Sequence, residues 1–179
     1  MRRTIHCLVA LAVLLPATDA MAENSTYFVI GPSVGMVHGT RIDSAAATSV
    51  DATFGLHLEG DRSWVSPPRY SFMLWTSGGV RLWHLDDMAA VPYVEAGVNL
   101  FLNVGGGYGY LASGKHSARH TAHLFVGAPI MPALLFWGMK AKGLLFEPYY
   151  RPTWTLGKQG GETFHEWGLL VKYAFGSDL

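Results

Sequence analysis

Cysteine and charged residues are scarce in this 179-residue chain. It has one cysteine, and only 15% of its residues are charged. The 13 basic residues balance the 13 acidic ones, so the sequence gives no reason to expect a nucleic-acid partner. Half of the residues are hydrophobic and 13% are aromatic, a composition that argues against disorder. The length fits one domain, which could be a compact soluble domain or a membrane protein.

The first 22 residues predict a secretory signal peptide. Two arginines precede an apolar stretch over residues 5–16, and Ala20-Met21-Ala22 supplies the small-x-small cleavage element. The apolar stretch is too short for a membrane anchor, which needs about 20 residues. We expect cleavage after Ala22, which leaves residues 23–179 as one exported domain. The cysteine, Cys7, would be removed, so the mature chain would have no disulfide, thiolate catalysis or cysteine-ligated metal.

Alternation of apolar residues with polar or small ones dominates the rest of the chain. It is clearest over residues 49–59, 92–104 and 164–175, where it predicts strands with one apolar face. Turn residues delimit five further predicted strands, at residues 27–38, 69–82, 119–128, 133–140 and 144–154. Residues 105–115 could extend a strand or form a loop. Eight strands, an even number, suit an antiparallel up-and-down barrel.

One stretch is compatible with a different element. The twenty residues from 120 to 139 carry no formally charged side chain, which is enough for a transmembrane helix. Pro129 and Pro132 would interrupt the hydrogen bonds at the centre of such a helix, and two glycines weaken it further. The sequence therefore favours a hairpin of two strands around the prolines.

The direction of the apolar faces separates two kinds of barrel. A soluble, lipocalin-like barrel has an apolar interior and a charged exterior, whereas a membrane barrel has the reverse. The scarcity of charge favours a membrane barrel, because about a quarter to a third of a soluble surface is usually charged. Aromatic residues near the predicted strand ends resemble the girdles of membrane barrels. These residues are Tyr27, Phe28, Trp64, Trp83, Tyr149, Tyr150, Trp154, Trp167, Tyr173 and Phe175.

The exported start, the alternating strands and the final strand from Trp167 to Phe175 carry a family resemblance. The chain resembles the small, eight-stranded outer-membrane β-barrel proteins of Gram-negative bacteria. Barrels of that family typically end in an aromatic-terminated strand that the assembly machinery recognises, whereas here Gly176-Ser177-Asp178-Leu179 follow Phe175. The resemblance implies an outer-membrane location, membrane lipid and the barrel assembly machinery as partners, and a monomer. It implies an architecture and no particular activity.

In a membrane barrel the polar strand faces would line the lumen. Side chains fill an eight-stranded barrel, so charges there should form hydrogen-bonded ion pairs and leave no wide pore. A narrow ion path or a small polar binding site is the alternative. The residues predicted to point into the lumen are Asp51, His57, Glu59, Glu95, Asn99, Glu147, Arg151, Glu166 and Lys172.

Catalytic and metal sites find little support in the sequence. Lipid A deacylases of the outer membrane carry a His-x-Ser pair that a carboxylate orients. No histidine after the predicted signal peptide has serine two residues later. His116, Ser117 and His120 could still form a site assembled from loops. His116, His120 and His123 would converge on a metal if they lay on a helix, but His120 and His123 diverge on a strand. We therefore expect no cofactor and no metal.

The sequence thus predicts a non-enzymatic outer-membrane barrel with at most a narrow lumen. The predicted connections at residues 39–47, 86–91 and 157–162 are short, which argues against a large receptor surface. Two alternatives remain open. One is an outer-membrane enzyme that modifies lipid A or phospholipid, and the other is a soluble periplasmic carrier of the lipocalin type.

Overall fold

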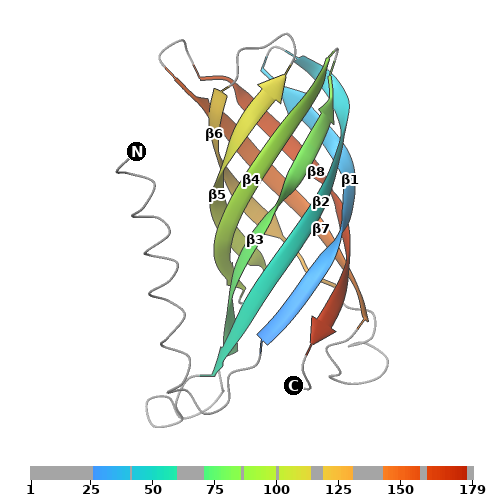
Figure 1. The fold of residues 1–179 in the computed structure, drawn as a ribbon, viewed down its shortest axis with the longest axis vertical. Helices are drawn as coiled ribbons and strands as arrows, with labels where there is room; N and C mark the ends of the chain where they lie inside the picture. The colour runs from blue at the N-terminus through green and yellow to red at the C-terminus, as the bar shows by residue number, and fades with distance from the viewer. Residues whose placement is uncertain are drawn as a thin grey trace.

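In the part of the chain that the structure describes, eight antiparallel strands close into an up-and-down barrel (Figure 1). The structure is a computed structural model that describes residues 26–40, 42–59, 71–85, 87–99, 101–113, 119–130, 143–157 and 161–176. The strands are β1 (Thr26–Gly39), β2 (Ile42–Glu59), β3 (Ser71–His84), β4 (Met88–Asn99), β5 (Asn103–Ser113), β6 (Arg119–Gly127), β7 (Gly143–Leu156) and β8 (Thr163–Gly176). Each pairs with its neighbour in the chain, and β1 pairs with β8 to close the ladder. The predicted all-β, eight-stranded antiparallel barrel is confirmed.

The strand predicted at residues 92–104 extends too far, because only residues 92–99 of it lie in β4. β4 ends at Asn99 and β5 begins at Asn103. The side-chain amide of Asn99 donates a hydrogen bond of 2.7 Å to the side-chain oxygen of Asn103. The apolar alternation runs on through this turn, so periodicity gave no sign of the break. The undecided region at residues 105–115 proves to be mostly β5. The strand predicted at residues 133–140 lies outside the described residues. The eight strands of the structure include β5 in its place.

The connections also differ from the prediction. The loop expected at residues 39–47 is mostly strand, because β2 starts at Ile42 and pairs Ala45 with Val37 of β1. Small residues there read as a loop, yet they fit the inside of the barrel, where Ala47 is buried. β4 likewise begins at Met88, inside the connection expected at residues 86–91, whereas residues 157–162 do connect β7 to β8.

The apolar stretch from residue 120 to 139 starts as the first arm of the predicted hairpin. It begins within β6, and beyond the end of that strand Ile130 forms an isolated bridge with Phe146 of β7. Residues 131–140 lie outside the described residues. Among the described residues, no helix has the length and hydrophobicity needed to cross a bilayer.

The strand ends define two ends of the barrel. At one end, which we name the turn end, β1, β3, β5 and β7 finish and the strands that follow them in the chain begin. β1 starts and β8 finishes at the opposite end, which we name the termini end (Figure 1).

Burial alternates along the strands and is inverted relative to a soluble protein. On β4, Val94 is 63% exposed on the outside, whereas its neighbour Glu95 is 4% exposed on the inside. Where the structure describes their side chains, all Asp, Glu, Lys and Arg residues of the strands occupy positions on the inward-facing alternation. The outward positions carry large apolar side chains on every strand. The barrel thus has an uncharged outer wall around a charged interior.

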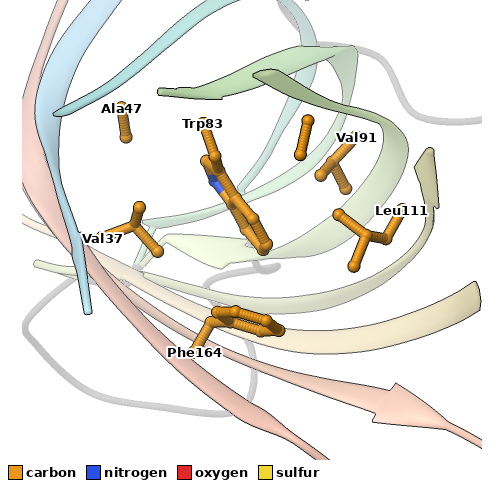
Figure 2. Close-up of a cluster of buried hydrophobic side chains, with 7 residues drawn as sticks. Val37, Ala47, Trp83, Val91, Leu111 and Phe164 are labelled. Atoms are coloured by element: carbon orange, nitrogen blue, oxygen red, sulfur yellow. The ribbon is translucent and has the colours of Figure 1, made fainter. Parts of the chain in front are cut away.

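An apolar cluster fills the lumen at the turn end, and we name it the plug (Figure 2). Its members are Val37, Ala47, Trp83, Ala89, Val91, Leu111 and Phe164. The rings of Trp83 and Phe164 lie 4.8 Å apart between their centroids, and both side chains are buried. The plug closes the lumen at this end with contacting side chains.

Two members of the predicted aromatic girdle are therefore misplaced. Trp83 belongs to the plug, and Tyr149 is buried in the lumen, since both alternate in phase with the inward charges of their strands. Tyr27 and Trp64 have side chains outside the described residues. The others are exposed on the outer wall: Phe28, Tyr150, Trp154, Trp167, Tyr173 and Phe175.

Candidate functional site

Ionisable side chains fill the lumen between the plug and the termini end. The buried ones are Asp51, Arg81, Glu95, His123, Glu147, Arg151, Glu166 and Lys172. From the set expected in the lumen, the structure places Asp51, Glu95, Asn99, Glu147, Arg151, Glu166 and Lys172 inside the barrel. The side chains of His57 and Glu59 lie outside the described residues. Sequence reasoning missed Arg81 and His123.

Arg151 on β7 joins two carboxylates from different sides of the barrel. Its Nη2 lies 3.0 Å from Oε1 of Glu95 on β4, and its Nη1 lies 3.5 Å from Oε1 of Glu166 on β8. All three side chains are buried. Glu166 also accepts hydrogen bonds from Trp83 Nε1 at 3.0 Å and from the Tyr149 hydroxyl at 2.7 Å. The plug is therefore tied to the charged interior through Glu166.

Arg81, His123 and Glu95 form a second chain of contacts. Arg81 Nη2 lies 3.3 Å from His123 Nδ1, and His123 Nε2 lies 3.0 Å from Glu95 Oε2. A guanidinium can only donate, so Nδ1 accepts and the ring proton resides on Nε2, which donates to Glu95. This geometry makes His123 a neutral link between the arginine and the carboxylate.

The ring of Tyr93 lies next to both guanidinium groups. The carbon Cζ of Arg81 lies 4.5 Å from the ring centroid of Tyr93, and Cζ of Arg151 lies 4.9 Å from the same centroid. Arg151 also lies 4.9 Å from the ring of Phe125 and 5.2 Å from that of Tyr149. The negative faces of these rings favour the cations where little water can reach them.

Lys172 and Glu147 form a third group nearer the termini end. Their charged atoms lie 3.6 Å apart, and Lys172 also donates to the hydroxyl of Thr53 at 3.3 Å. A cavity of about 30 Å³ lies beside them, with the buried ring of Trp75 in its wall. The indole N–H of Trp75 has no hydrogen-bond partner among the described residues. The cavity has room for about one or two water molecules and for no larger ligand.

Glycines on the inward face make room for these groups. A Cβ at Gly107 would lie 2.6 Å from Glu95 Cβ and 2.6 Å from His123 Nε2. A Cβ at Gly97 or Gly105 would collide with the ring of Trp75. The glycine-rich start of β5 thus allows Glu95, His123 and the indole of Trp75 to pack directly against the backbone.

In the described part of the lumen, no serine hydroxyl is hydrogen-bonded to a histidine. His123 bonds to Arg81 and Glu95, and within the described residues it contacts no serine hydroxyl. Ser49 instead donates to Asp51 at 2.9 Å. No group of three or more potential metal ligands is found in the residues described.

Of the three candidate catalytic residues, the described part of the chain includes His120. His120 is exposed on the outer wall of β6, where its Nδ1 bonds to the Tyr108 hydroxyl. His116 and Ser117 lie outside the described residues. His120 and His123 point to opposite faces of β6, the arrangement expected of a strand.

The alternation of residues in the sequence does indicate the position of Arg81. Arg81 falls in the predicted strand at residues 69–82, in phase with Ser77 and out of phase with the apolar Val80 and Leu82. Applying the same alternation there would have placed Arg81 in the lumen. His123 likewise shares its phase on the strand with Thr121, which is buried.

The sequence matches no protein-family model and no curated protein. Two solved structures that resemble the barrel are both of Ail, the attachment invasion locus protein of Yersinia pestis, and one of them holds the heparin analogue sucrose octasulfate. Each is 11% identical to this chain and covers 86% of it and 100% of the Ail chain, with TM-scores of 0.33 and 0.34. This similarity says nothing about activity or ligands.

Proposed function

We propose that this chain is a monomeric, integral outer-membrane β-barrel protein with a structural, non-enzymatic role in the envelope. The observation that carries the proposal is the inverted burial, with an uncharged apolar outer wall around buried charges. In water such a wall would expose far more contiguous apolar surface than a soluble monomer tolerates. A bilayer makes the same wall favourable, because lipid chains contact it and closed pairing satisfies the backbone.

The height of the apolar wall supports the same proposal. A path along cross-strand partners that starts at His38 on β1 runs once round the barrel and returns to β1 at Phe28. Every outward position of β1 between these two residues is apolar, namely Ile30, Pro32, Val34 and Met36. The interval from His38 to Phe28 spans about 33 Å along the strand. A strand tilt of about 40° reduces this to a height of about 25 Å. That height matches the apolar band of outer-membrane barrels, about 25 Å tall.

The first test is heat modifiability. We expect the full chain, expressed with its export segment, to stay with urea-washed outer membranes and to run as a fast, compact band that shifts on boiling. A closed ladder of strands survives detergent, so the unheated barrel stays compact. Release with the soluble periplasm and no heat shift would contradict the proposal and favour a carrier.

A second expectation concerns conduction. Because the plug packs at the turn end and ion pairs fill the middle of the lumen, we expect no continuous water path for ions. We expect the purified barrel, inserted into a planar bilayer, to give no single-channel current. Steady, reproducible conductance steps from the heat-modifiable protein would show that the lumen opens.

A further inference from the structure

Histidines are concentrated on one rim of the outer wall. In the described strands, the histidines on outward positions are His38 on β1, His84 on β3, His120 on β6 and His165 on β8. Each lies within two residues of its strand's limit at the turn end. Because the outward positions of the described strands carry no Asp, Glu, Lys or Arg, these imidazoles are the ionisable nitrogen groups on the wall.

The ladder places these histidines at nearly one height. His38 pairs directly with His165. One circuit along ladder partners starts at His38 and ends lower on the same strand, at Phe28. This drop is spread over eight strands, so residues at equal height are offset from ladder partners by a little more than one residue per strand. With this offset, one level contains His38, His84, His120, Tyr110 and Trp154, and His165 lies about one residue below it. We name the four histidines the histidine ring.

Hydroxyl groups from neighbouring strands orient three of the imidazoles. Nδ1 of His165 lies 2.6 Å from the Tyr150 hydroxyl, Nδ1 of His120 bonds to the Tyr108 hydroxyl, and Nε2 of His84 lies 3.3 Å from the Thr48 hydroxyl. When the hydroxyl donates, the proton of the neutral ring resides on the other nitrogen. That second nitrogen has no protein partner among the described residues, so it is left to donate outward.

We infer that the histidine ring binds the phosphate groups of anionic lipids around the barrel. This inference rests on the proposed membrane position. The ring lies at the upper limit of an apolar wall about 25 Å tall, which is the level at which headgroups begin. An imidazole N–H donates to an ionised phosphate oxygen in a charge-assisted hydrogen bond, about twice as strong as a neutral one. On the outward positions of the described strands, no carboxylate competes for these donors.

The location favours a lipid phosphate over a free one. The donors project from the side of the barrel directly next to the apolar wall, whereas the lumen behind them is closed by the plug. A lipid can place its chains on the wall and its phosphate at the ring in one step. A free anion would gain only the hydrogen bonds.

The test measures lipid enrichment in nanodiscs. The barrel is placed in discs of mixed phosphatidylglycerol and phosphatidylcholine, and native mass spectrometry identifies the lipids that stay bound. We expect the unmodified barrel to retain phosphatidylglycerol with a several-fold enrichment over the bulk mixture. The four-position variant carries His38→Phe, His84→Phe, His120→Phe and His165→Phe, which removes the N–H donors and keeps aromatic rings at the interface. It should retain lipids in the bulk ratio.

Met88→Phe is the matched control. Met88 is exposed on the same rim and pairs directly with His84, so this change adds a phenylalanine beside the ring without removing a donor. It should keep the enrichment. The four-position variant should keep the heat shift in phosphatidylcholine alone, which shows that it folds.

The contradicting outcomes are separable. A folded barrel without enrichment, or a folded four-position variant that keeps it, would overturn this inference and leave the membrane proposal standing. Loss of enrichment in millimolar inorganic phosphate would assign the ring to free anions instead. A chain that folds in no bilayer would refute the membrane proposal itself, together with the ring.

Discussion

Replacing Arg151 by methionine is expected to lower the free energy of unfolding of the barrel by about 3–5 kcal/mol. Arg151 is completely buried, and it is the nearest cation to both Glu95, at 3.0 Å, and Glu166, at 3.5 Å. Methionine keeps the packing volume but leaves both carboxylates with much less compensation in a closed lumen. Arg81 can relieve only part of this, since its nearest contact to Glu166 is 3.7 Å. Urea unfolding in vesicles, followed by loss of the compact unheated band, measures the change.

A second substitution separates lost attraction from lost packing. Glu95→Gln in the Arg151→Met background removes a carboxylate that the first change leaves unpaired. We expect the double variant to be less destabilised than the sum of the two single variants, because they share one ion pair. Additive losses, or an Arg151→Met loss below about 1 kcal/mol, would show that the central ion pairs contribute little to stability.

The phase of the strands was the most predictable feature of this protein. Asp51, Glu95 and Glu166 were assigned to the lumen because each alternates with apolar neighbours, and a strand must send such neighbours to opposite faces. The alternation of apolar and polar residues does not reveal a turn when it continues unchanged from one strand into the next. Residues 101 and 102 continue the alternation of β4, yet they lie between β4 and β5. Local periodicity records the face of a residue and does not record where pairing reverses.

The partners inside the lumen could not be predicted in the same way. Arg151 on β7 reaches Glu95 on β4, a strand that is not its neighbour in the ladder. Such a contact depends on how far the register advances round the barrel, which is a property of the whole closed ladder. The plug has a similar origin. Trp83 looks like an interface residue in the sequence, and only its phase with Arg81 shows that it points inward.

Lysine at the middle of the outer wall is expected to cost about 2–4 kcal/mol of stability. Val94 is 63% exposed on β4, and by the ladder it lies close to midway between the levels of His38 and Phe28. In a bilayer, Val94→Lys places a charge in hydrocarbon with no carboxylate on the outer positions of the described strands to pair with it. Urea unfolding of the barrel in vesicles measures the loss.

The matched control changes only the depth of the lysine. Leu156 is exposed at the end of β7, where it pairs with His120 of the histidine ring. Leu156→Lys removes a similar apolar side chain at headgroup level, so the expected loss falls to about 0–1 kcal/mol. A soluble barrel would tolerate both lysines equally, because water surrounds its whole outer wall. The difference between the two variants therefore measures whether the wall at Val94 contacts lipid or water.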